Sequence, residues 1–289
     1  MMTDAIRFLR CGRFNFLLNR PYVMAILNAT PDSFSGNGVL PHRDQLLAQA
    51  EAAIAAGADM LDIGGESTRP GAQAVSEQEE LDRVIPVLEA LHDWNVALSV
   101  DTMKPAVMRE AVRAGVDMIN DVNGFQAPGA VDAVADSQTG LCVMHMQGEP
   151  RSMQANPWYA DVVNDVADFL SARVSVLQQA GVAEERILLD PGFGFGKNFE
   201  HNQALFQALP LLCAESLPVL VGVSRKSMLG QITGRDVRQR GAASVSAALM
   251  AAQAGAAFVR VHDVAETVDA LKVWQALAPR HFAASSVGR

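Results

Sequence analysis

The stretch VALSVDTMKPAVMREAVRAGVDMINDV (residues 96–122) decides the fold class of this chain. Its two ends, 96–101 and 118–122, are apolar segments with the length of buried strands, and residues 104–115 between them have helical period. Gly115 closes the helical segment, where a left-handed helix C-cap is expected. A strand, a helix and a second strand in this order predict a βαβ unit with parallel strands.

The same pattern recurs along the whole chain. Strands are expected at 23–28, 60–65, 96–101, 118–122, 141–146, 187–190, 219–224 and 258–262. Helical segments separate them, and the glycines expected to end these helices are Gly57, Gly115, Gly140, Gly181 and Gly255. Eight strands with a helix after each predict a single α/β domain, a (β/α)8 TIM barrel. An open doubly wound sheet is the alternative, but no dinucleotide-binding glycine motif follows the first strand.

No linker rich in Pro, Gly or Ser divides the chain, so residues 21–280 are expected to form one barrel domain. Residues 1–20 are expected to add an N-terminal β-hairpin that turns at Cys11-Gly12, because the following residues alternate apolar and polar. The arginines of this segment leave a transit peptide as the alternative. Residues 281–289 are expected to be a C-terminal tail.

Composition narrows the class of protein. Apolar residues make up 49% and aromatic residues 6% of the chain, which favours a core of aliphatic side chains between helices and parallel strands. The net charge of -9 argues against a nucleic-acid binder. No apolar run approaches the roughly 20 residues of a membrane span. Three widely spaced cysteines predict free thiols and a cytoplasmic location.

Polar residues stand at the carboxyl ends of all eight expected strands, which is where barrels of this kind place their active sites. These residues include Asn28, Glu66, Asp101, Asn120, Asp121, His145, Asp190, Ser224, Lys226, Arg260 and His262. A single polar strand end is often only a helix cap. Agreement at eight ends predicts a polar site at one mouth of the barrel.

Four of these residues indicate a type of ligand. The carboxylates of Asp101 and Asp190 accept hydrogen bonds, the ammonium of Lys226 donates them, and the amide of Asn120 can do either. Such a ring suits a flat heterocycle with an amino-pyrimidine edge better than it suits a sugar or a lone carboxylate.

An anion site is expected separately. Arg260 and His262 follow the last strand, where barrels frequently bind phosphate. The stretch LLDPGFGFGKN (188–198) looks like a phosphate loop, but Pro191 has no N–H and no hydroxyl residue follows Lys197. Lys197 is therefore expected to be solvated or structural.

Seven segments resemble, in chain order, motifs of the dihydropteroate synthase family, whose members join 4-aminobenzoate to a dihydropterin pyrophosphate in folate biosynthesis. They are ILNATPDSFSGNG, DIGGESTRPGA, SVDTMKPAVMREAVRAGVDMINDVNG, VMHMQGEP, DPGFGFGKN, GVSRKSMLG and RVHDV. The resemblance covers roughly residues 20–265, and each motif stands at the end of its own expected strand.

The resemblance implies roles for named residues. Pterin contacts are implied for Asp101, Asn120, Met144, Asp190, Lys226 and Arg260. Pyrophosphate contacts are implied for Thr68, Arg260 and His262, with Asn28 as a ligand of the accompanying Mg²⁺. A 4-aminobenzoate subsite is implied for Phe34, Arg69, Pro70, Phe195, Ser224 and Ser227. Catalytic roles are implied for Asp32 and Lys226. The loop that contains Asp32 is long and bears glycines, from which a mobile lid is expected. The family also implies a homodimer, with the helix at 241–255 in the interface.

The implied reaction is driven by departure of pyrophosphate. Mg²⁺ and cationic side chains stabilise the leaving group, and the pterin ring delocalises the positive charge left on its methylene. An aniline nitrogen is unprotonated at neutral pH, so no strong base is needed.

Three other functions remain open at this stage. Lys226 could form a Schiff base in an aldolase, which requires a lowered lysine pKa. A pterin-dependent methyltransferase barrel shares the pterin ring but has no use for two anion sites. A non-catalytic pterin-binding paralogue is suggested by residues 36–38, Gly-Asn-Gly, where the family commonly has Asp-Gly-Gly. A metal site at His145 is disfavoured, because no Cys or His partner stands at ligand spacing.

Overall fold

The computed structural model describes residues 7–30, 39–67, 74–215 and 217–278. Eight parallel strands form one sheet in the order β8-β7-β6-β5-β4-β3-β10-β9. They are β3 (Tyr22–Asn28), β4 (Met60–Gly64), β5 (Ala97–Asp101), β6 (Met118–Asp121), β7 (Gly140–Met144), β8 (Ile187–Asp190), β9 (Leu220–Val221) and β10 (Phe258–Val261). A parallel bridge between Leu189 and Val219 joins β8 to β9 and closes the ring. All eight expected strands are present, and the expected barrel is confirmed.

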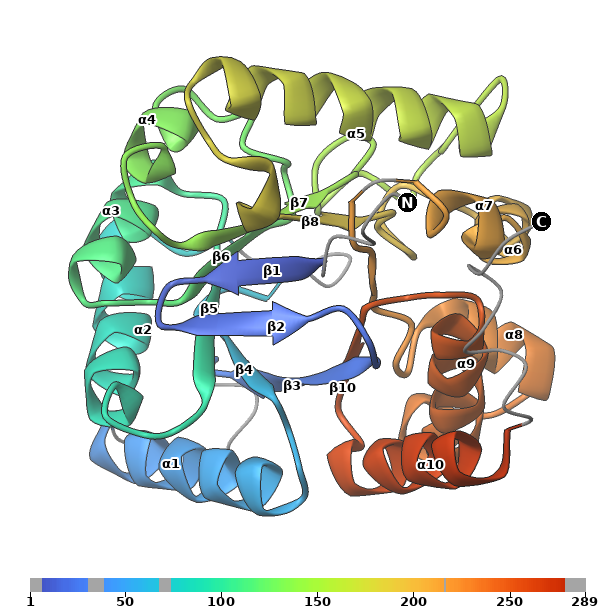
Figure 1. The fold of residues 1–289 in the computed structure, drawn as a ribbon, viewed down its shortest axis with the longest axis horizontal. Helices are drawn as coiled ribbons and strands as arrows, with labels where there is room; N and C mark the ends of the chain where they lie inside the picture. The colour runs from blue at the N-terminus through green and yellow to red at the C-terminus, as the bar shows by residue number, and fades with distance from the viewer. Residues whose placement is uncertain (1–6, 31–38, 68–73, 216, 279–289) are drawn as a thin grey trace, which may run out of the picture.

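Helices surround the ring of strands (Figure 1). They are α1 (Val39–Ala55), α2 (Glu77–Leu91), α3 (Pro105–Arg113), α4 (Ala130–Val134), α5 (Val162–Gln179), α6 (Phe199–Gln207), α7 (Leu209–Leu212), α8 (Ser227–Thr233), α9 (Gly241–Gln253) and α10 (Val264–Leu277), with short 3-10 turns η2 (Glu184–Arg186) and η3 (Val237–Gln239). Side chains of Ser76, Asp161 and Asn198 cap the N-termini of α2, α5 and α6. The main core lies between the strands and these helices.

Four of the five glycines expected at helix ends have the left-handed backbone that such a position requires: Gly57, Gly115, Gly181 and Gly255. The expectation for Gly140 was wrong. Gly140 is the first residue of β7, and a Cβ there would lie 2.6 Å from the Cys11 sulfur. Glycine is needed at this position because the N-terminal hairpin packs directly against the strand.

The N-terminal hairpin consists of β1 (Phe8–Cys11) and β2 (Phe14–Leu17) and turns at Gly12-Arg13, one residue later than expected. It covers a buried cluster to which every barrel strand contributes at least one side chain. These side chains are Met24, Met60, Ala97, Met118, Cys142, Leu188, Leu220 and Phe258. Leu9, Cys11 and Phe16 pack onto them, and the hairpin lies across the ring of strands (Figure 1). One end of the barrel is therefore plugged by apolar side chains.

An ion pair holds the hairpin in place. Asp117 is fully buried and accepts the Leu98 N–H at 2.9 Å and the Arg13 N–H at 3.0 Å. The Arg13 Nη2 lies 2.7 Å from the second oxygen of Asp117. The buried carboxylate is thus fully hydrogen-bonded, as the cost of burying a charge requires.

The cysteines and the apolar character of the helices can also be compared with the sequence. Cys11, Cys142 and Cys213 are free thiols. Among the described helices, none combines the length and the apolar character needed to cross a membrane.

Candidate active site

A polar layer lies directly above the apolar plug. Side chains of a strand alternate between its two faces, so residues two positions beyond the plug also point into the barrel. In this layer are Asp62, Ser99, Asn120, Met144, Asp190 and Arg260. The strand period therefore brings most of the expected pterin contacts to one level inside the barrel.

An arginine between two carboxylates forms the centre of this layer. The Arg260 Nε lies 2.6 Å from an oxygen of Asp62, and its Nη2 lies 2.9 Å from an oxygen of Asp101. Ser99 donates a hydrogen bond of 2.6 Å to the other oxygen of Asp62. The two carboxylates fix the direction of the guanidinium, and they raise the pKa of Arg260 against the effect of its burial.

Asp62 was not among the expected site residues. It is fully buried and stands in the middle of β4, between the apolar residues Leu61 and Ile63. An ionisable residue inside an otherwise apolar buried strand is itself a signal, because burial of a charge requires a partner. That signal was present in the sequence at residues 60–64 and identifies the residue, although not its partner.

The amide of Asn120 has an unsatisfied oxygen. Its Nδ2 donates to Asp62 at 3.1 Å, which fixes the orientation of the amide. Its Oδ1 is buried and has no hydrogen-bond partner among the described residues. A buried acceptor without a donor costs about 1–3 kcal/mol, and a ligand N–H at this point would recover that energy.

Three further groups have pKa values shifted by burial. Burial raises the pKa of Asp101 to about 7, with Arg260 opposing the shift, and raises that of Asp190 to about 6, with the Gly192 N–H opposing it. Burial lowers the pKa of Lys226 to about 8, and the charge of Arg260 adds to this effect. Titrating groups with shifted pKa values in one place are typical of functional sites.

Apolar side chains form a wall beside the polar layer. A buried cluster contains Val122, Met144, Met146, Met153 and Phe195, with Met103 packed against it. The Lys226 Nζ lies 4.1 Å from the centre of the Phe195 ring. Ring faces and methionine sulfurs can pack on a planar ligand. Met103, Met146 and Met153 were not among the expected site residues. In the sequence each stands between polar residues, and nothing in that pattern marks them as part of a site.

Ser224 and His262 form a unit at the ends of β9 and β10. The Ser224 hydroxyl accepts the His262 backbone N–H at 3.2 Å and lies 3.0 Å from His262 Nδ1. A hydroxyl that accepts one bond can still donate its own hydrogen or accept a second bond, so it can pair with Nδ1 in either direction. Ser224 therefore orients His262.

Arg225 sets the direction of the neighbouring Lys226. Its backbone is left-handed, with φ of 59°, which is uncommon for a residue with a side chain. The side chain of Asp263 pairs with its guanidinium, and the Ser244 hydroxyl accepts its N–H at 2.9 Å. These contacts stabilise the sharp turn from which Lys226 points into the site.

The remaining expected residues are distributed as follows. Asn28 ends β3 and is half-buried, while Ser227 begins α8 and is exposed. Asp32, Phe34, Thr68, Arg69 and Pro70 lie outside the described residues.

His145 is buried in the wall of the site, with its ring centre 4.9 Å from that of Phe169 in an edge-to-face arrangement. Among the described residues no group of three His, Cys, Asp or Glu side chains could hold a metal ion. His145 therefore packs among aromatic side chains in the wall of the site.

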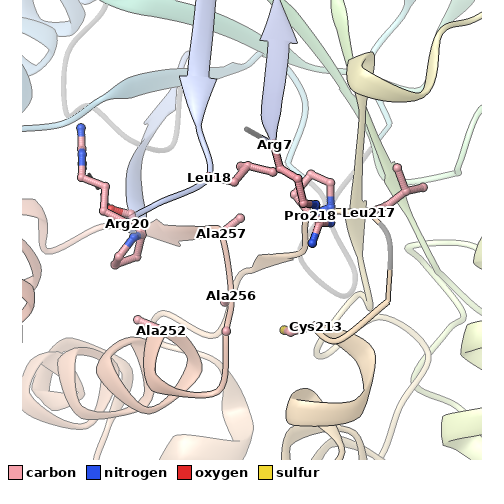
Figure 2. A pocket seen from close by; sticks show the side chains of 11 residues that line it. Arg7, Leu18, Arg20, Cys213, Leu217, Pro218, Ala252, Ala256 and Ala257 are labelled. Carbon is pink, nitrogen blue, oxygen red and sulfur yellow. Dashed lines mark hydrogen bonds between the residues drawn. The ribbon is translucent and has the colours of Figure 1, made fainter. Parts of the chain in front are cut away.

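A cavity of about 190 Å³ lies at the other end of the barrel. It is bordered by Leu217 and Pro218, just before β9, and by Ala256 and Ala257, just before β10 (Figure 2). The polar layer stands at the opposite ends of these strands, so this cavity is separate from the candidate site.

The site belongs to a known class. Residues 24–262 match the family of pterin binding enzymes, and the chain belongs to that family. Within it, the chain groups with the dihydropteroate synthases, which are transferases of folate synthesis. The resemblance noted in the motifs is thereby confirmed.

The similarity extends over nearly the whole chain. The dihydropteroate synthase of Neisseria meningitidis serogroup C is 52% identical over 273 residues, which are 93% of this chain and 96% of the relative. The crystal structure of the Burkholderia cenocepacia enzyme complexed with 7,8-dihydropteroate is 56% identical, covers 99% of this chain and 100% of its own, and has a TM-score of 0.87. The Xanthomonas albilineans enzyme with 4-aminobenzoic acid is 50% identical, covers 95% and 100%, and has a TM-score of 0.89.

Proposed function

We propose that this chain condenses a dihydropterin pyrophosphate with 4-aminobenzoate to give dihydropteroate and pyrophosphate. The observation that carries the proposal is the buried Oδ1 of Asn120, which lacks a donor among the described residues and stands in the same layer as Asp190 and Arg260. The relatives bound to 7,8-dihydropteroate and 4-aminobenzoic acid give the chemistry of the missing partners.

The pterin edge matches the polar layer group by group. An amino-pyrimidine edge presents N–H donors, which Asn120 Oδ1 and the carboxylate of Asp190 would accept. It also presents a carbonyl and a ring nitrogen, to which Lys226 would donate. Asp101 completes this set of contacts. Met144 and Arg260 lie at the same level of the barrel as these contacts. They would therefore pack on the two faces of the ring, Met144 on one and Arg260 on the other.

The pyrophosphate would lie toward the end of β10. Arg260 and His262 supply cationic and N–H donors there, and Thr68 is proposed as a third contact. We propose that Mg²⁺ arrives with the pyrophosphate and that Asn28 contributes one oxygen. A single neutral amide fits such an ion, because Mg²⁺ usually keeps several waters and takes further oxygens from phosphate. The ion would stabilise negative charge on the leaving group.

The aminobenzoate would lie beside Phe195, with Phe34 and Pro70 proposed to complete the aromatic subsite. Ser227 is proposed to bind the carboxylate through its hydroxyl and N–H, together with Arg69. Helix α8 has only seven residues, so Ser227 would act by local hydrogen bonds rather than by a large helix dipole. Ser224 would act through His262, because its hydroxyl is already engaged there.

The reaction breaks the bond between the pterin methylene and the pyrophosphate oxygen and forms a bond from that carbon to the amine nitrogen. The electron pair of the broken bond leaves with pyrophosphate, where Arg260 and His262 meet the developing charge. Asp32 is proposed to stabilise the cationic methylene, and Lys226 to hold the pterin ring in place. The amine then loses its extra proton to solvent.

The decisive experiment mixes the purified protein with the dihydropterin pyrophosphate, Mg²⁺ and labelled 4-aminobenzoate. Labelled pteroate is the expected product. Pterin binding without product would favour the non-catalytic paralogue, and methyl transfer to an acceptor would favour the methyltransferase barrel. The lowered pKa of Lys226 meets one requirement of a Schiff-base enzyme, so borohydride trapping with carbonyl compounds is the control.

We also propose a homodimer. Six exposed large apolar side chains of the described residues lie on α7 to α10 and the turn η3, and contact with a second copy of the chain could bury such side chains. These side chains are Leu211, Ile232, Val237, Met250, Val273 and Leu277. Analytical ultracentrifugation should give twice the mass of one chain, and Met250→Glu should shift the equilibrium toward monomers.

For the organisation of the chain, we propose a hairpin extension at residues 1–20, a barrel at 21–280 and a tail at 281–289. The family match to residues 24–262 supports the middle assignment. We propose the cytoplasm as its location, since free thiols are typical of reducing compartments.

A further inference from the structure

The loop after β8 folds around a buried lysine. Lys197 is 2% exposed, and its Nζ donates to the carbonyl oxygens of Gly192 at 2.9 Å and Phe195 at 3.1 Å. The Nζ also lies 2.8 Å from His145 Nδ1. A fourth and longer contact, of 3.4 Å, joins Nζ to the His145 carbonyl oxygen. The three shorter contacts match the three N–H donors of an ammonium group. Of the two possibilities expected for Lys197, solvated or structural, the structure shows the second. The contacts of its ammonium group are with other residues of the protein.

The histidine partner is suited to accept this bond. Burial, followed by the charge of Lys197, lowers the pKa of His145 to about 3, so the ring is neutral and its Nδ1 can accept a hydrogen bond from the ammonium group. Burial lowers the pKa of Lys197 to about 7, and the nearby charge of Asp190 opposes that shift. The proton between the two side chains therefore belongs to the lysine.

The loop packs by its backbone against residues 145–147. Gly192 and Gly196 both have left-handed backbones, with φ of 71° and 63°. A Cβ on Gly192 would lie 1.9 Å from the His145 carbonyl oxygen, and one on Gly196 would lie 2.3 Å from that of Gln147. Such close approach leaves no room for other side chains to satisfy the inward carbonyls of the loop. Lys197 supplies the donors that these carbonyls need.

The residue held by this arrangement is Phe195. Its carbonyl is bonded to Lys197, and its ring lies 4.1 Å from the Lys226 Nζ in the candidate site. On the outer side, the Tyr159 hydroxyl donates to Gly196 O at 2.8 Å. The side chains of Asp190 and Asn202 accept the N–H groups of Gly192 and Gly194, at 2.7 Å each. Lys197 is the side chain that donates to the carbonyl of Phe195 itself, so it supports the backbone at the residue that carries the ring.

We propose that Lys197 is a positioning residue, whose buried ammonium fixes the loop 192–196 and thereby holds the Phe195 ring where the aromatic amine substrate binds. This inference rests on the proposed function for the identity of that substrate. It assigns to Lys197 an effect on the affinity for 4-aminobenzoate, separate from the affinity for the pterin. Asp190, which ends β8, accepts the Gly192 N–H at 2.7 Å and so touches the loop, but the pterin contacts Asn120 and Arg260 lie on other strands. The larger effect should therefore fall on 4-aminobenzoate.

The test compares Lys197→Met with Lys272→Met, the same change at an exposed lysine of α10. In Lys197→Met, KM for 4-aminobenzoate should rise about tenfold or more, while KM for the dihydropterin pyrophosphate changes by less than about threefold. Lys197→Arg keeps the charge and should recover part of the affinity. Lys272→Met should match the unsubstituted protein. Equal rises in both KM values, or no rise for 4-aminobenzoate, would overturn the proposal.

A second measurement does not depend on turnover. Hydrogen exchange of a peptide covering residues 190–199 should be about tenfold faster in Lys197→Met than in Lys272→Met. An unchanged exchange rate would overturn the role of Lys197, whatever reaction the protein catalyses. Failure of the proposed function alone would give a different result, namely no labelled pteroate from the unsubstituted protein. If Lys197→Met does not fold, Tyr159→Phe takes its place. It removes the outer bond to Gly196 and should raise the same KM by a smaller factor, and an unchanged KM and exchange rate in Tyr159→Phe would count against the proposal.

Discussion

The guanidinium of Arg260 is joined to the buried carboxylate of Asp62, with 2.6 Å between Arg260 Nε and Asp62 Oδ2, across 198 positions of the sequence. Asp62 also receives the Ser99 hydroxyl and the Asn120 amide. One carboxylate therefore orients three side chains of the polar layer. Under the proposed function, these side chains are groups that would meet the pterin.

Replacing this carboxylate tests that role. Asp62→Asn removes the buried charge opposite Arg260, and the free energy of unfolding should fall by about 3 kcal/mol, as for other broken buried pairs. Ser99→Ala removes only one hydrogen bond and should cost about 1 kcal/mol. Urea denaturation of both variants gives the comparison. Equal stability of the two variants would show that the ion pair is not the dominant contact.

The unsatisfied oxygen of Asn120 predicts a variant that binds poorly but folds well. Asn120→Ala should weaken binding of the dihydropterin pyrophosphate about tenfold to a hundredfold, since it removes an acceptor made only for the ligand. The melting temperature should change little, because loss of the Nδ2 bond to Asp62 is offset by removal of a buried acceptor that has no donor in the free protein. Calorimetric titration measures the affinity, with Asn95→Ala at an exposed position as the matched control. Unaltered affinity in Asn120→Ala would contradict the assignment.

The ionised carboxylate of Asp190 should lower the stability of the folded protein, although the proposed function requires it. Burial raises its pKa from 3.8 to about 6, so ionisation above pH 6 opposes folding by about 3 kcal/mol, while below pH 3.8 both states are protonated and there is no cost. Asp190→Asn should therefore be more stable than the unsubstituted protein at pH 8, with the gain shrinking as the pH falls from 6 to 4. Urea denaturation at pH 4.5, 6 and 8 checks the trend. Pterin affinity should fall at the same time. A gain in stability that is the same at all three pH values would refute this explanation.

The pH dependence of turnover should have two limbs. As the pH falls through about 7 and 6, Asp101 and Asp190 take up protons and lose their capacity to accept from the pterin. As the pH rises through about 8, Lys226 loses its proton and its donor strength. The value of kcat/KM for the pterin substrate should thus peak near pH 7 to 8. In Lys226→Arg the alkaline limb should move above pH 10, in turnover or, if turnover is too slow, in pterin affinity. An alkaline limb that stays near pH 8 would assign it to another group.

A substitution that loosens the N-terminal hairpin should lower the free energy of unfolding without weakening substrate binding. Arg13→Ala leaves Asp117 buried with only backbone donors, and the free energy of unfolding should fall by about 2 kcal/mol, allowing for the partial exposure of Arg13. Both KM values should remain unchanged, because the hairpin lies at the plugged end of the barrel. Arg113→Ala, at a mostly exposed ion pair on α3, should change stability by less than about 0.5 kcal/mol. A changed KM in Arg13→Ala would show that the plug influences the site.

The sequence by itself determined the barrel and the end at which the site lies. Strands such as Ala97–Asp101 and Met118–Asp121 were predictable because alternation and apolar length are local properties of the chain. Their polar ends were predictable because all parallel strands present their carboxyl ends at the same mouth. Gly140 was the exception among the glycines, since its smallness is required by the distant residue Cys11.

Only the tertiary structure decided which charges pair and which polar atoms remain open. Asp62 appeared in the sequence as one more residue of a strand, and its partner Arg260 is brought to it by closure of the ring. The open oxygen of Asn120 depends on Asp62 taking the other end of the amide. The burial of Lys197 depends on backbone contacts between two loops. Local patterns record the period of an element, whereas energies of buried charges depend on neighbours that only the closed barrel supplies.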